Sequence, residues 1–156
     1  FTALQSQRQL YAGSDTYEKV SARPDFSVLL FPVVSLRKPY DTTRTRLEII
    51  GETPNAQAEN AWSLDTYASA DAPPMIIFAS ADDKTAPPGH GIMLFEKLNA
   101  AGASAELHMF RDGGHGWGLG RPEQVLNQWP EMFIKWFDSG KIVQKSRENE
   151  DDNQIF

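Results

Sequence analysis

Two short stretches of the sequence, residues 26–31 and 75–79, are apolar at nearly every position, and this feature most restricts the possible folds. A strand with one face in water alternates apolar and polar residues. A near-continuous apolar run is instead typical of a strand covered on both faces, as in a parallel sheet. Residues 105–110 are a third predicted strand. The sequence therefore predicts a sheet packed between layers of helices.

Two helices are expected to provide those layers. Pro87 and Pro88 mark the start of the first, and Gly102 is placed to cap its end. Its expected apolar side carries Ile92, Phe95 and Leu98. The second is expected to run from Pro130 to Gly140, with the apolar face Met132, Phe133, Trp136 and Phe137. Strands that alternate with helices predict an α/β fold with a doubly wound parallel sheet.

The rest of the chain gives weaker signals. The 156 residues fit one domain, and no linker divides two cores. Residues 1–10 are expected to be the end of a helix, and a short helix is expected over residues 55–62. Residues 141–156 are polar and highly charged, and we expect a flexible tail there. The chain begins at Phe1 without a Met, so we expect it to be part of a longer gene product.

Charge and composition exclude several kinds of function. The net charge is −6 and the sequence has no Lys/Arg cluster, which argues against a nucleic-acid partner. No apolar run is long enough to span a membrane. There is no cysteine, so thiolate metal sites and a Cys nucleophile are excluded. We expect neither a metal nor a cofactor.

A carboxylate and an imidazole follow two of the predicted strands. Asp82 and Asp83 come directly after residues 75–79, and His115 lies in a glycine-rich loop after residues 105–110. The carboxyl ends of parallel strands meet at one edge of a sheet, so these side chains are expected to lie together. A carboxylate that accepts from one imidazole nitrogen leaves the other free to act as a general base. Asp83 is the preferred acid and Asp82 is its rival.

The remaining aromatic and histidine side chains have simpler interpretations. His90 lies near a helix start and His108 within a strand, and both are expected to be structural. The spacing of the three histidines matches no standard zinc pattern, so we discount a metal site. Trp117, beside His115, is either a substrate-binding residue that lines an acyl or sugar pocket or a packing anchor.

Several segments resemble a known family. Residues 81–88, Ala-Asp-Asp-Lys-Thr-Ala-Pro-Pro, resemble the turn that carries the catalytic acid in α/β-hydrolases. Residues 113–119, Gly-Gly-His-Gly-Trp-Gly-Leu, resemble the histidine loop of the esterase branch of this fold, which includes acetylxylan and feruloyl esterases. Residues 23–26, 31–35 and 71–74 look like the same branch. The resemblance covers roughly residues 11–139.

The resemblance implies a fold and a set of roles. Residues 1–140 would be the C-terminal portion of one α/β-hydrolase domain, with its last three strands and last two helices. Asp83 would be the acid and His115 the base of a Ser-His-Asp triad. The implied function is a carboxylic ester hydrolase that acts on small-molecule or polysaccharide esters, such as acetyl or feruloyl esters.

The nucleophile of that family is absent from the sequence. It lies on a Gly-x-Ser-x-Gly elbow, and no serine in the 156 residues has this context. The nearest match, residues 102–106, lacks the second glycine and joins a helix to a strand. One oxyanion donor would follow the nucleophile. We therefore expect this chain alone to be inactive.

Two alternatives remain open from the sequence. A peptidase of the prolyl oligopeptidase type uses the same order of acid and histidine. A non-catalytic interaction or assembly module is the other alternative, because the strand near Phe26 would have an exposed edge if no strand precedes it. Self-association through that edge is expected in this case.

Overall fold

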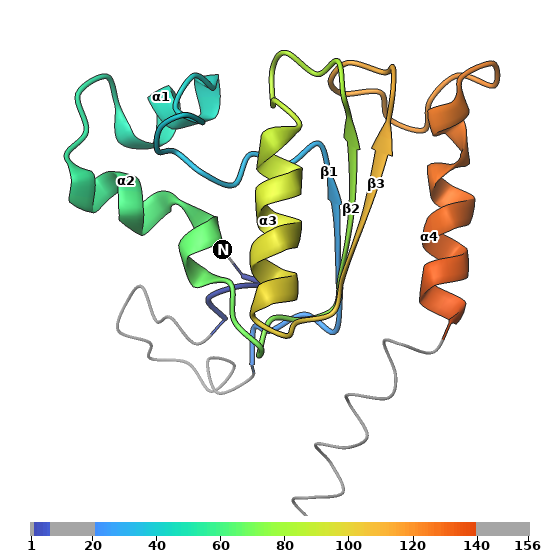
Figure 1. Ribbon diagram of the computed structural model, residues 1–156, viewed down its shortest axis with the longest axis horizontal. Helices are drawn as coiled ribbons and strands as arrows, with labels where there is room; N and C mark the ends of the chain where they lie inside the picture. Colours follow the sequence, from blue (N-terminus) through green and yellow to red (C-terminus); the bar gives the residue numbers. More distant parts are fainter. Residues whose placement is uncertain (1, 7–20, 140–156) are drawn as a thin grey trace, which may run out of the picture.

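A single parallel sheet forms the centre of the molecule. The computed structural model describes residues 2–6 and 21–139. Within them the sheet has the order β1-β2-β3, with β1 at Ser27–Leu30, β2 at Met75–Ser80 and β3 at Ala105–Phe110. All three strands point the same way, so their carboxyl ends share the upper edge of the sheet in Figure 1. The predicted parallel sheet is confirmed.

The central strand packs against a separate apolar cluster on each face, which explains its continuous apolar sequence. Met75 and Ile77 belong to the cluster shared with α3, which spans Gly89–Ala100; we call it the α3-side cluster. Ile76 and Phe78 belong to the cluster shared with α4, which spans Trp129–Asp138; we call it the α4-side cluster. Figure 1 shows α3 and α4 on opposite sides of the sheet. Truncating one of these large β2 side chains to Ala is expected to cost about 2–5 kcal/mol.

The face of α3 that is buried differs from the expected one. Its buried residues are His90, Gly91, Leu94 and Leu98. Ile92 is 39% exposed, and Phe95 is only partly buried against the α3-side cluster. The stripe from His90 through Leu94 to Leu98 has the i, i+4 spacing of one helix face, and Ile92 lies on another face. Ala101 is the C-cap, and Gly102 follows with a φ of 80°.

The second helix agrees better with the sequence pattern. α4 begins at Trp129, one residue before the expected start. Trp136 is buried, and Met132 and Phe133 pack partly into the α4-side cluster. Phe137 is 41% exposed, although its ring still contacts Phe26 with a centroid distance of 5.3 Å. Gly140, expected to end the helix, lies outside the described residues.

The chain between β1 and β2 forms an excursion with three helical segments. They are α1 at Arg44–Ile50, α2 at Ala56–Trp62 and the 3-10 helix η2 at Leu64–Tyr67. α2 confirms the short helix expected over residues 55–62, whereas α1 and η2 were not expected. α1 has no buried residue, so it lacks the buried apolar stripe whose period identifies a helix in a sequence.

Much of both ends of the chain lies outside the described residues, so only part of the predictions made there is tested. Residues 2–4 form a turn and not the end of a helix. The rest of residues 1–10, apart from residues 5 and 6, lies outside the described part, as does the tail at 141–156. Among the residues that the structure describes, no helix is both long and apolar enough to cross a membrane.

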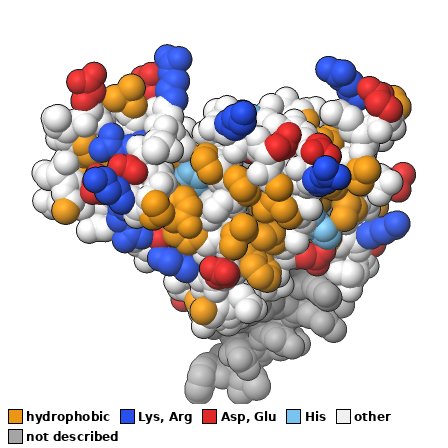
Figure 2. Space-filling model, turned by 45° about the horizontal axis from the view of Figure 1, so that its top comes forward, with side chains coloured by type: hydrophobic (Ala, Val, Ile, Leu, Met, Phe, Trp, Pro, Cys, Tyr) orange, Lys and Arg blue, Asp and Glu red, His pale blue; other side chains and the backbone are white. Residues whose placement is uncertain are grey.

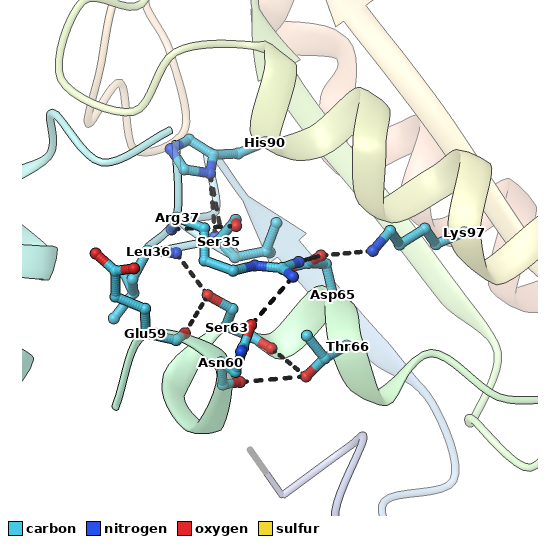
Figure 3. Close-up of polar contacts among 11 residues, drawn as sticks. Ser35, Leu36, Arg37, Glu59, Asn60, Ser63, Asp65, Thr66, His90 and Lys97 are labelled. Atoms are coloured by element: carbon cyan, nitrogen blue, oxygen red, sulfur yellow. Dashed lines mark hydrogen bonds and ion pairs between the residues drawn. The ribbon is translucent and has the colours of Figure 1, made fainter. Parts of the chain in front are cut away.

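A buried carboxylate fastens the excursion to α3. The side chain of Asp65, in η2, is fully buried, and its Oδ2 accepts hydrogen bonds from Arg37 and from Lys97 Nζ, the latter at 2.6 Å. Figure 3 shows Lys97 reaching this oxygen from α3 and Arg37 reaching it from the opposite side. Ser63 Oγ accepts from the backbone N–H of Leu36 at 2.9 Å. These contacts fix the start of the excursion beside the sheet.

The surface near the carboxyl ends of the strands is not uniformly polar. Figure 2 tilts the upper edge of the sheet toward the viewer. Apolar side chains gather in the middle of this face, with most of the charged side chains around them. Such a distribution suits a surface that contacts apolar parts of a ligand or of another protein segment.

Candidate active site

Asp83 is held in a tight turn directly after β2. Its backbone N–H donates to the carbonyl of Ser80 at 3.3 Å. Its Oδ1 accepts from the backbone N–H groups of Thr85 and Ala86, both at 2.8 Å. The Asp83 side chain is 1% exposed, so these two hydrogen bonds are made to a carboxylate that is shielded from water. Backbone hydrogen bonds of the turn alone thus fix the orientation of the carboxylate.

The second oxygen of Asp83 contacts His115. The distance from His115 Nδ1 to Asp83 Oδ2 is 2.9 Å. A carboxylate only accepts hydrogen bonds, so Nδ1 carries the proton and Nε2 of the neutral ring has the free lone pair. The imidazole is 35% exposed, and among the described residues Nε2 has no hydrogen-bond partner. This arrangement leaves one nitrogen available to take a proton from a reacting group.

Asp82 contacts the histidine loop at another point. Its Oδ1 accepts from the backbone N–H of Gly114 at 2.8 Å, next to His115 in the chain. This hydrogen bond is the main reason that the pKa of Asp82 lies below its ordinary value. Asp83, and not Asp82, therefore contacts the imidazole in the structure, while Asp82 ties the turn after β2 to the loop after β3.

The glycines of the histidine loop allow it to approach the sheet closely. A Cβ at Gly113 would lie 2.5 Å from both Ser80 Oγ and a methyl carbon of Leu126, so any larger residue would force these two side chains to move. Gly114 has a φ of 62°, a conformation that favours glycine. At the other end of the loop, the Gly118 carbonyl accepts from Trp129 Nε1 at 2.9 Å. The loop is thus held at both ends.

An aromatic cluster lies beside the imidazole. The ring centroid of Phe31, just after β1, is 4.6 Å from that of His115 and 4.9 Å from that of Trp117. Trp117 also packs edge-on against Phe110 with a centroid distance of 6.0 Å. Trp117 is partly buried in the α4-side cluster, so it has a packing role whatever else it does. Sequence reasoning did not single out Phe31, although its place at the carboxyl end of a strand was a usable signal.

His90 and His108 lie away from this pair. His90 is fully buried in α3, and its Nδ1 accepts from the backbone N–H groups of Val34 and Ser35, both at 3.4 Å. Figure 3 shows this ring directed at the chain after β1. Burial lowers the pKa of His90, against a smaller opposing effect of Asp65 and Asp83. His108, on β3, pairs with Glu106 at 2.6 Å and stacks on Phe78.

The described residues offer a proton-transfer site and no evident metal site. Within residues 2–6 and 21–139, no three His, Asp or Glu side chains are grouped so that they could hold a metal ion. The three strands instead bring Phe31, Asp83 and His115 to one edge of the sheet, each just after a different strand. An oriented imidazole with a buried carboxylate behind it is suited to general acid–base catalysis.

Comparison with known proteins agrees with this geometry. Residues 26–140 match the prolyl oligopeptidase family. The chain belongs to this family. The matched region runs from the residue before β1 to the end of α4, so it includes the three strands, Asp83 and His115.

The relatives that this chain resembles have names that refer to esters or esterases. An acetylxylan esterase of Xylanibacter ruminicola is 25% identical over 128 residues, which are 80% of this chain and 27% of that protein. An acetyl ester-xyloside bifunctional hydrolase of Caldicellulosiruptor lactoaceticus is 28% identical, with a TM-score of 0.78, and the match covers 88% of this chain and 51% of that one.

A third relative is also named for ester hydrolysis. A Thermogutta terrifontis esterase with bound propionate is 25% identical, with a TM-score of 0.65, and the match covers 85% of this chain and 48% of that one. This member of the prolyl oligopeptidase family thus spans about half the length of these two solved proteins. The parallel sheet and its two flanking helices are part of an α/β-hydrolase fold, as the sequence predicts.

Proposed function

We propose that this chain supplies the acid and the base of a serine-dependent carboxylic ester hydrolase. The observation that carries the proposal is the contact between His115 Nδ1 and the buried Asp83 carboxylate at the carboxyl ends of β2 and β3. In this role Asp83 holds the imidazole with Nε2 directed at the reacting groups. The esterases among the relatives support this assignment.

His115 moves protons in two half-reactions. Its Nε2 takes the proton of a serine hydroxyl as the serine oxygen bonds to the ester carbonyl carbon, and returns that proton to the leaving alcohol. It then takes a proton from water, whose oxygen bonds to the acyl carbon, and returns the proton to the serine oxygen as the acid is released. No serine of the 156 residues lies in a Gly-x-Ser-x-Gly elbow, so another polypeptide segment contributes it.

The proposed substrates are acetyl or other small acyl esters of carbohydrates. Two relatives support this class, since their names refer to acetylxylan and to an acetyl ester with a xyloside. Trp117 is the proposed substrate-binding residue, because its partly buried ring lies in the aromatic cluster that contacts His115. An indole face suits contact with an acyl chain or a sugar ring.

The first test uses the chain alone. We expect p-nitrophenyl acetate to be hydrolysed at the same rate by this chain and by its His115→Ala variant, because the serine nucleophile is missing. A rate that depends on His115 would show that the chain contains a nucleophile of its own.

The second test compares two adjacent carboxylates in a polypeptide where a serine-bearing segment precedes Phe1. Asp83→Asn should lower kcat by about 10⁴-fold, because an amide no longer holds the imidazole in the required tautomer. Asp82→Asn is the matched control and should have a far smaller effect, since Asp82 accepts from the backbone N–H of Gly114 and the imidazole contacts Asp83. Equal losses of kcat in the two variants would contradict the assignment of Asp83, and not Asp82, as the acid of the triad.

The second candidate function is hydrolysis of peptides, and the family match favours it. The same acid and base serve an amide substrate, with an amine as the leaving group. To distinguish the two functions, kcat/KM of the serine-containing polypeptide is measured for acetylated xylan and for proline-containing peptides. Preference for the peptides would replace the ester proposal.

A third proposal concerns assembly. Among the described residues β1 pairs only with β2, so its other edge presents unpaired backbone groups that favour self-association. Light scattering at micromolar concentrations should detect dimers or larger species of this chain. Ser27→Lys, at the start of β1, should shift the distribution to monomer, and Ser21→Lys, outside the strand, should not. A monomeric wild-type chain would contradict the proposal.

A further inference from the structure

The backbone of Phe31 has an unusual conformation. Among the residues that the structure describes, it is the one non-glycine residue with a positive φ, 41°. The Cβ of a bulky side chain crowds the backbone in this region, so the conformation is strained. Strained residues persist where the surrounding contacts determine them, and they cluster at functional sites. The contacts of Phe31 therefore indicate what the strain maintains.

Three contacts hold Phe31 in place. Its backbone N–H donates to the carbonyl of Phe78 at 2.7 Å, which continues the β1–β2 ladder one residue beyond β1. Its ring lies tilted by 59° to the His115 ring, and by 80° to the Trp117 ring. The chain turns at Phe31 directly after the strand, and this turn leaves the ring beside the histidine loop.

His115 needs such a contact because its polar restraint is incomplete. One hydrogen bond, from Nδ1 to Asp83, fixes one edge of the imidazole but leaves the ring able to tilt about that bond. About a third of the side chain is exposed, so water competes for the ring. An aromatic wall at 4.6 Å restricts this tilt without competing for either nitrogen.

We propose that Phe31 is a positioning residue that holds the imidazole of His115 against Asp83. The consequence for catalysis rests on the proposed function, whereas the restraint itself is a property of this chain. Removing the ring should increase the fraction of His115 rings that have left Asp83 by about two- to tenfold, the equivalent of one aromatic pair.

The test is the exchange of the His115 Nδ1 proton with water, observed as a low-field proton resonance of the full chain. The chain has three histidines, and loss of the signal in His115→Gln assigns it. Phe31→Gly relieves the backbone strain but removes the ring, so exchange should be about two- to tenfold faster. Phe31→Tyr keeps the ring and should exchange as the wild type does.

A matched control separates this restraint from general stability. Phe133→Leu removes an aromatic ring of the α4-side cluster that packs on Phe26, Trp136 and Phe137, and it should leave the exchange rate unchanged. If Phe31→Gly does not fold, Phe31→Asn also accepts a positive φ without a ring and replaces it. If the folded variant without the ring exchanges the His115 Nδ1 proton at the wild-type rate, the proposal is wrong. This measurement needs no hydrolysis assay, so its outcome can be distinguished from a failure of the proposed function.

Discussion

The described part of the chain contains two carboxylate–imidazole pairs, and the shorter of the two is the less suited to catalysis. His108 Nε2 lies 2.6 Å from Glu106 Oε1, with both residues on β3. His115 Nδ1 lies 2.9 Å from Asp83 Oδ2, and the two residues follow different strands. Distance alone would select the first pair.

The carboxylates of the two pairs differ in how they are held. Glu106 is 39% exposed at the side chain, and Asp83 is 1% exposed. Asp83 also accepts two backbone hydrogen bonds, from Thr85 and Ala86, which fix its orientation. A partly exposed pair such as Glu106–His108 contributes little to stability. The comparison teaches that the anchoring of the carboxylate, and not the length of its contact, marks an acid that can orient a base.

The largest expected effect concerns the two imidazoles. In a polypeptide that includes the serine, His115→Gln should lower kcat by about 10⁶-fold, because the general base is lost. His108→Gln should retain most of the activity, since that ring stacks on Phe78 and pairs only with Glu106. Initial rates with p-nitrophenyl acetate measure both. A large loss in His108→Gln without unfolding would break the comparison.

The two carboxylates should also differ in their contribution to folding. Asp83→Ala leaves the N–H groups of Thr85 and Ala86 without an acceptor and should lower the free energy of unfolding by about 1–3 kcal/mol. Glu106→Ala removes a half-exposed pair and should cost less than about 1 kcal/mol. Urea unfolding of the full chain measures both. Equal costs would mean that the backbone anchoring of Asp83 is not the relevant difference.

The sequence could predict the Asp83–His115 contact because topology brings the ends of parallel strands together. β1 and β2 were predictable for a different reason, since a near-continuous apolar run is typical of a strand in a covered parallel sheet. The ring contact of Phe31 and the bond from Gly114 to Asp82 depend on local backbone geometry that no spacing rule contains. α1 was missed because Leu47 and Ile49 are exposed, so its apolar residues form no buried stripe.

His90 sharpens the comparison in a third way, because its imidazole is fully buried without a carboxylate in hydrogen-bond contact. Burial holds its pKa below the ordinary value, so between those two values the unfolded chain binds a proton that the folded chain does not. The resulting stability is fully present above the ordinary histidine value of about 6.5 and is lost as the pH falls below it.

The free energy of unfolding of the full chain should therefore decrease as the pH falls from about 7.5 to about 5. His90→Gln keeps an acceptor for the N–H groups of Val34 and Ser35 but cannot titrate, so part of this decrease should disappear. Urea titrations of both proteins across the range give the difference. All other titrating groups are common to both proteins, so their contributions cancel in the difference. Identical pH profiles would mean that His90 is protonated as readily in the folded chain as in the unfolded one, and that burial without a carboxylate does not distinguish this imidazole from the other two.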